Sequence, residues 1–112
     1  MQTSDVLNKA ADHIQQYGHH KGAALGGGHW STASACTIGA ISIAGTDAGG
    51  ERNTVELAAL AAMICHLGTG LVGWNDAPER TASEVVEALR AAALIEAAKE
   101  IDVRVVAPAG VQ

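Results

Sequence analysis

Large aromatic side chains are scarce in this chain. It has no phenylalanine, two tryptophans and one tyrosine among 112 residues, whereas hydrophobic residues of all kinds make up 48%. That hydrophobic content indicates a globular protein rather than a disordered one, and the length predicts a single helical domain, 1–112. Alanine is abundant, and alanine-rich helices can approach one another closely. We therefore expect tightly packed helices, with Trp74 as the large residue that fills the core.

Positive charge, long apolar runs and cysteine are also in short supply. The net charge of −5 argues against a nucleic-acid backbone or an anionic membrane as the main partner. No apolar run reaches the roughly 18 residues that span a bilayer. The polar start, Met-Gln-Thr-Ser-Asp, lacks the apolar region of a signal peptide. We expect a cytoplasmic protein in which Cys36 and Cys65 are free thiols.

Apolar residues recur at helical spacing in four segments, which predicts a mainly α fold: a compact four-helix domain. The first segment, 4–17, is amphipathic and is expected on the outside. The second and third, 34–44 and 54–67, are apolar on nearly every side and are therefore expected to form a buried antiparallel pair. The fourth runs over about 82–100.

The segment before the second predicted helix is rich in glycine. Gly22 and the run 26–28 make a helix improbable there, because glycine costs about 1 kcal/mol at an interior helical position. The residues that flank the run, 23–25 and 29–31, predict a small β-hairpin at the periphery, with a mobile loop as the alternative.

The tail, 100–112, alternates weakly between apolar and polar residues over 101–106, which is typical of a strand. Pro108 and Gly110 are expected to end it. We expect this short strand to pair with the hairpin or to bind a partner.

Trp74, Asn75 and Asp76 predict a sharp turn, because the short side chains of Asn and Asp bond to nearby backbone N–H groups. Arg80 is expected to form a local ion pair with Asp76 across this turn. A capping box then follows: Thr81 and Glu84, three residues apart, precede an apolar run and place the helix start near residue 82.

The helix that starts there carries two apolar stripes. At about 100° per residue, one face holds Val85, Val86, Leu89, Ala92 and Ala93, and a nearly opposite face holds Ala91, Leu94, Ala98 and Ile101. One straight helix cannot turn both faces to the same core. Either the helix bends, or the second stripe is buried against another chain. We favour the second option, with a homodimer as the expected arrangement.

Cys36 is the strongest single candidate for a reactive residue. It lies near an expected helix start, where the positive end of the helix dipole stabilises a thiolate. With a histidine such as His29 as base and Asp76 as orienting group, it would form the arrangement of a thiol hydrolase. In the alternative interpretation, Cys36 is a small buried hydrophobe that packs against Gly39. No local signature of a cysteine hydrolase surrounds it.

Three loop histidines and Cys36 raise a second alternative, because imidazole and thiolate both bind zinc. The histidines are His19, His20 and His29. Their spacing matches no standard zinc finger, so we expect no metal and no cofactor, with a metal-binding loop as the alternative.

Two short motifs stand out along the chain. One is Cys-x-x-Gly-Ala at a helix start, here Cys36-Thr37-Ile38-Gly39-Ala40. The other is Trp74-Asn75-Asp76, followed by Arg80-Thr81 and Glu84-Val85. Together they resemble a family of domains of unknown function found in actinobacteria and their phages. The resemblance covers about Val6 to Leu94 and departs from the family at His19 and in the glycine-rich segment. It implies a mostly helical domain and a phage origin, and it supplies no catalytic residue.

These observations favour a small non-enzymatic interaction domain with an accessory or regulatory role, acting on a host protein if phage-encoded. The uncovered stripe motivates this expectation, together with the lack of a convincing catalytic set. The expected partner-binding residues are Ala91, Leu94, Ala98 and Ile101.

Overall fold

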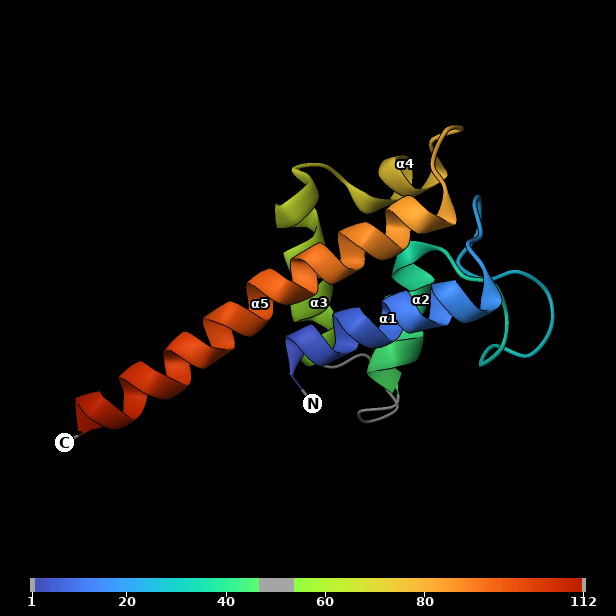
Figure 1. Ribbon diagram of the computed structural model, residues 1–112. Helices are drawn as coiled ribbons and strands as arrows, with labels where there is room; N and C mark the ends of the chain where they lie inside the picture. The colour runs from blue at the N-terminus through green and yellow to red at the C-terminus, as the bar shows by residue number, and fades with distance from the viewer. Residues whose placement is uncertain (1, 47–53, 112) are drawn as a thin grey trace.

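The structure, a computed structural model, describes residues 2–46 and 54–111, with side chains up to 101. The described residues form five helices (Figure 1): α1 (Thr3–Tyr17), α2 (Thr37–Thr46), α3 (Thr54–Leu67), α4 (Leu71–Asp76) and α5 (Ala82–Val111). The mainly helical fold is confirmed. The fifth helix is the short α4, which occupies the segment where the sequence predicts only a turn. No described helix combines the length and the apolar character needed to cross a bilayer.

Helix α1 lies at the centre of the fold, contacting α2, α3 and α5. Its inward residues Val6, Leu7 and Ala10 are completely buried, whereas Asn8 and Asp12 on its polar side are exposed, as expected for an amphipathic helix with an outer face. By contrast, α3 is not buried on every side as predicted, because Leu57 and Ile64 are about half exposed. An alanine-rich helix has little amphipathic pattern, so its sequence does not show which side faces inward.

Helix α5 packs along α1, and polar contacts tie the two helices together at two points. The Arg90 guanidinium donates to the Asp12 carboxylate, 2.7 Å away. Further along, the Ser4 hydroxyl donates to Glu100 at 2.7 Å. Ser4 lies in the first turn of α1, whose N-cap is Gln2. Figure 1 shows the C-terminal part of α5 continuing well past the other helices.

The expected β-hairpin is absent from the described residues. Leu25 forms an isolated antiparallel bridge with Ala35, and His19 forms a parallel bridge with the same residue. No ladder develops, because the two segments predicted as strands do not pair with each other. The buried His13 side chain helps to hold this loop, since its Nε2 lies 2.7 Å from the Ala33 carbonyl oxygen and must donate to it.

The predicted strand in the tail is also wrong, because α5 remains helical to Val111. A strand needs a neighbouring edge for its backbone hydrogen bonds, and the described part of the chain offers no sheet. A continuing helix satisfies those groups within the segment itself. The weak alternation over 101–106 does not outweigh this.

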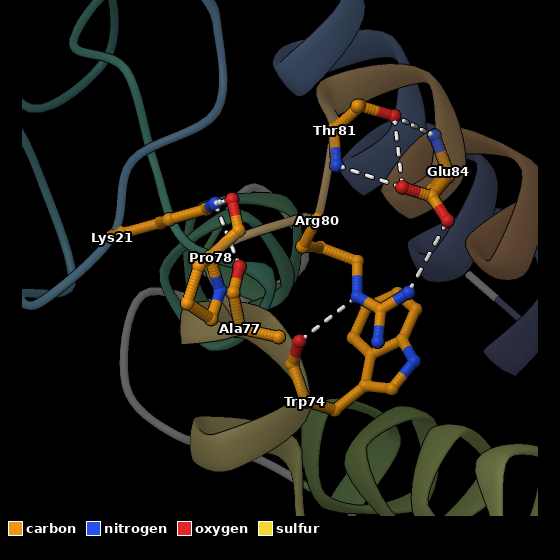
Figure 2. Close-up of polar contacts among 7 residues, drawn as sticks. All are labelled: Lys21, Trp74, Ala77, Pro78, Arg80, Thr81 and Glu84. Atoms are coloured by element: carbon orange, nitrogen blue, oxygen red, sulfur yellow. Dashed lines mark hydrogen bonds and ion pairs between the residues drawn. The ribbon is translucent and has the colours of Figure 1, made fainter.

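The connection between α4 and α5 is built around Trp74 and Arg80 (Figure 2). Arg80 donates through Nε to the Trp74 carbonyl oxygen at 2.9 Å, and its guanidinium carbon lies 4.2 Å from the indole centroid. Trp74 packs at the edge of the core rather than at its centre. The expected ion pair with Asp76 is not found, because Arg80 instead pairs with Glu84 at 3.3 Å.

The capping box at the start of α5 is confirmed. The Thr81 N–H donates to Glu84 at 3.0 Å, and the Glu84 N–H donates to the Thr81 hydroxyl at 3.2 Å (Figure 2). The backbone and hydroxyl of Thr81, and then Arg80, hold the pKa of Glu84 below its ordinary value. A lowered pKa in the folded state means that this contribution to stability is present at neutral pH. It is lost as the pH falls through the folded-state pKa.

Candidate functional site

Both sequence motifs meet in one cleft of about 270 Å³. Three segments form it: the loop after α1, the start of α2, and α4. Its lining residues are Gly22, Ala23, Ala24, Cys36, Ile38, Leu71, Val72, Asn75 and Asp76. The two motifs are therefore parts of one site, although they lie far apart in the sequence.

Asn75 holds the three segments together and is only 2% exposed. Its Oδ1 accepts from the Thr37 N–H at 2.8 Å and from the Thr37 hydroxyl at 2.7 Å. A backbone N–H can only donate, so this contact fixes which end of the amide is oxygen. His19 Nε2 lies 2.7 Å from the same oxygen and must therefore carry a proton. On the other side, the Asn75 amide nitrogen donates to the His20 carbonyl oxygen at 3.1 Å.

Asp76 is the charged group of the cleft. Its Oδ1 accepts from the Asn75 amide at 2.9 Å and from the Gly22 N–H at 3.1 Å. The hydrogen bond from Asn75, then that from Gly22, and the more distant positive charges of His19 and Lys21 lower the pKa of this carboxyl. Asp76 is therefore ionised at neutral pH.

Cys36 is the N-cap of α2, so its predicted place at a helix start is correct. Its Sγ accepts from the Gly39 N–H at 3.2 Å, and its carbonyl accepts from the Ala40 N–H at 2.9 Å. The thiol is partly exposed at the cleft, and both Cys36 and Cys65 are free. The alternative interpretation expects contact with Gly39, which is present, and burial of the thiol, which is only partial.

Gly39 leaves room for the loop to cross α2. The Ala24 carbonyl oxygen accepts from the Cys36 N–H at 2.9 Å, and a Cβ at Gly39 would overlap that oxygen. This explains in physical terms why the first motif has glycine three residues after its cysteine.

We expect Gly39→Ala to lower the free energy of unfolding by about 1 kcal/mol, because overpacking costs about 1–3 kcal/mol and outweighs the gain in helix propensity. Gly73→Ala, in α4, is the matched control: a Cβ there meets nothing within 4 Å. It should be neutral or stabilise by up to about 1 kcal/mol. Urea unfolding followed by circular dichroism measures both. Equal effects at the two sites would contradict this explanation.

The structure brings together two of the three residues of the hypothetical thiol hydrolase. Cys36 and Asp76 line the same cleft, but His29 does not. His29 bonds through Nδ1 to the Ser31 hydroxyl at 2.7 Å and stacks on Trp30 in the exposed loop. His19 is nearer to the motif, but its protonated Nε2 is already committed to Asn75. Among the residues that line the cleft there is no imidazole to act as the base.

The loop histidines do not assemble a metal site. Within 2–46 and 54–101, no three His, Cys, Asp or Glu side chains converge on one point where a metal ion would bind. His19 and His29 make the separate contacts described above, so the metal-binding alternative has no ligand set in this part of the chain.

A second surface lies on α5, on the side that faces away from the other helices. Leu94 is 75% exposed and Ile101 is 60% exposed, whereas Val85 and Leu89 on the opposite side are fully buried. Ala98 is exposed and Ala91 partly so. We call Ala91, Leu94, Ala98 and Ile101 the outer face of α5. The prediction that this stripe is not covered by its own fold is confirmed.

A family model described as "Family of unknown function (DUF6197)" matches residues 1–94. The chain belongs to this family. No curated protein and no solved structure matches it.

The DUF6197 match contains both motifs and every residue that lines the cleft. It ends at Leu94, so Ala98, Ile101 and the rest of α5 lie beyond it. Thr37, Gly22 and Leu71 are not predicted from the sequence as parts of the site. Their roles depend on contacts between distant segments, for which this sequence carries no local signal.

Proposed function

We propose that the protein is a non-enzymatic interaction domain that associates through the outer face of α5. The observation that carries the proposal is the exposure of Leu94, 75%, in a helix whose opposite side is buried at Val85, Leu89 and Ala93. Isolated apolar residues on a surface are ordinary. Here they recur at intervals of three, four and three residues, which is the spacing of a helix-pairing seam.

The occupant that best fits this seam is a second copy of the chain, in antiparallel orientation. We place a two-fold axis at the level of residue 96 along the helix. Ala91 then faces the partner's Ile101, and Leu94 faces the partner's Ala98. Each contact then joins one small and one large side chain, so the two surfaces interlock. A parallel pair would instead place alanine against alanine, leaving gaps that weaken packing.

The expected dimer is weak. The outer face runs from Ala91 to Ile101, which is about 15 Å along a helix axis. An interface of that length falls short of the roughly 800 Å² per partner that stable complexes bury. Association should therefore depend on concentration.

Sedimentation velocity between micromolar and millimolar protein tests the proposal. We expect the average mass to rise with concentration, and Leu94→Asp to abolish the rise because it places a charge in the seam. Leu57→Asp is the matched control, since Leu57 is exposed on α3, outside the outer face. A wild-type protein that stays monomeric throughout, with Leu94→Asp indistinguishable from it, would overturn the proposal.

Disulfide trapping tests the orientation, in a background with Cys36→Ser and Cys65→Ser. Serine is itself a good N-cap, so the first change preserves the start of α2. Antiparallel pairing predicts that a chain with Ala91→Cys cross-links to a chain with Ile101→Cys, and that two copies of the same variant do not cross-link. Cross-linking between two copies of the same variant, without the mixed product, would indicate a parallel pair. A phage setting and a host protein as partner remain predictions that rest on the family resemblance alone.

A further inference from the structure

The cleft contains a carboxylate, Asp76, that forms no direct ion pair with the described residues. Asp76 uses Oδ1 for its contacts with Asn75 and Gly22, and its Oδ2 has no hydrogen-bond partner among the described residues. Lys21, the nearest lysine in the loop, directs its Nζ to the Ala77 and Pro78 carbonyl oxygens at 2.7 and 3.2 Å (Figure 2). Within the described residues, neither Lys21 nor His19 forms an ion pair with Asp76. Oδ2 of Asp76 can therefore accept a hydrogen bond from a cationic ligand.

The walls beside this carboxylate are apolar. Ala24, Ile38, Leu71 and Val72 supply them, from three different segments of the chain. The cleft volume of about 270 Å³ is slightly below the roughly 300–1,000 Å³ of pockets for drug-sized ligands. It suits a short aliphatic chain rather than a nucleotide or a sugar polymer.

Asp76 is also held in place before any ligand arrives. Two donors fix its Oδ1, and one of them, the Asn75 amide, is itself fixed by Thr37. A pre-positioned acceptor loses little conformational entropy on binding. An anionic ligand would meet like charge here, and a purely apolar one would leave the carboxylate without a partner.

We propose that the cleft binds an alkylammonium group, with the ammonium on Asp76 Oδ2 and the aliphatic chain along Leu71, Val72 and Ile38. A lysine side chain of another protein and a free primary amine share this chemistry. The site is separate from the outer face of α5, so a test of ligand binding does not depend on whether the proposed dimer forms.

Amide chemical shifts in two-dimensional NMR provide the test, with n-butylammonium chloride as the probe at constant ionic strength. We expect saturable shifts at the amides of Gly22, Ala24 and Asp76. Butylammonium should bind about tenfold more tightly than methylammonium. This corresponds to about twofold per added methylene, half the effect of full burial because the cleft is open to solvent. n-Butanol should bind more weakly than butylammonium.

Asp76→Asn tests the role of the charge, because an asparagine oxygen can still accept from Gly22 and Asn75. We expect about fivefold weaker binding of butylammonium, the upper range for a solvent-accessible ion pair. Glu79→Gln is the matched control: it removes the same charge from an exposed residue that does not line the cleft, and should change binding less than twofold. If Asp76→Asn does not fold, the chain-length and alcohol comparisons in the wild type still decide the question.

Three results would overturn the proposal: no saturable shift, equal binding of butanol and butylammonium, or unchanged binding by a folded Asp76→Asn variant. Titration with N-acetyl-lysine amide separates the two sources of the ligand. Binding at least as tight as that of butylammonium indicates a lysine side chain. Exclusion of the lysine derivative, with butylammonium still bound, indicates a free amine.

Discussion

Asn75→Ala is expected to lower the free energy of unfolding by about 3 kcal/mol. The substitution leaves the buried Thr37 N–H and the His20 carbonyl oxygen without their partner, and each such orphaned group costs about 1–3 kcal/mol. Thr37 and His19 lose a shared acceptor as well. Water entering from the cleft satisfies part of this loss, which keeps the expected value below the sum of the individual costs. Urea unfolding monitored at the helical circular dichroism band gives the number.

Asn8→Ala is the control for this experiment. Asn8 is exposed, and its Oδ1 accepts a single hydrogen bond from Arg90 at 3.2 Å, so the change should stay within about 0.5 kcal/mol. Thr37→Val supplies a second check, because it removes the hydroxyl and keeps the N–H. The Asn75→Ala/Thr37→Val double variant should lose less than the sum of the single effects. Strict additivity, or an effect of Asn75→Ala no larger than that of Asn8→Ala, would contradict the central role of Asn75.

Leu89→Ala and Leu94→Ala should differ by about 3 kcal/mol, although both change the same residue type in the same helix. Leu89 is fully buried against the core and Leu94 is 75% exposed. Burial of a leucine that is then cut back to alanine costs about 2.7–5 kcal/mol. A surface substitution costs less than about 0.5 kcal/mol. Both variants keep a good helix former, so helix propensity does not account for the difference.

The comparison must be made at low protein concentration, where the proposed dimer is dissociated. At high concentration Leu94→Ala should become destabilising as well, because the wild type then gains stability from association. The Leu89→Ala effect should change little with concentration. If the two leucines proved equally costly in the monomer, the assignment of inner and outer faces on α5 would be wrong.

Part of this architecture follows from local patterns in the sequence. The two stripes of α5 follow from a rotation of about 100° per residue. Val85 and Leu89 of one stripe are buried, and Leu94 and Ile101 of the other are exposed, as predicted. The Thr81 and Glu84 capping box is equally local, because both partners lie within one helical turn. Patterns of this kind depend only on helix geometry, which is the same in every fold. They can therefore be predicted without knowledge of distant contacts.

Other features could not be predicted because they depend on distant neighbours. Arg80 has Asp76 and Glu84 at similar separations in sequence, and it pairs with Glu84 while its Nε donates to the Trp74 carbonyl oxygen. The glycine-rich segment has the composition of a hairpin turn, but Leu25 finds Ala35 as its neighbour instead. The cleft depends on the same kind of contact. The sequence therefore shows the two motifs but does not show that they lie side by side in the fold.

The contact between Ser4 and Glu100 marks the last described side-chain contact between α5 and the rest of the fold. The backbone of α5 that follows projects past the other helices (Figure 1), so we expect a change in its length to leave the core undisturbed. Two related chains can therefore have the same core and cleft and differ in the C-terminal part of α5. Natural variation in this family should accumulate in the part of α5 after Glu100 sooner than around Asn75.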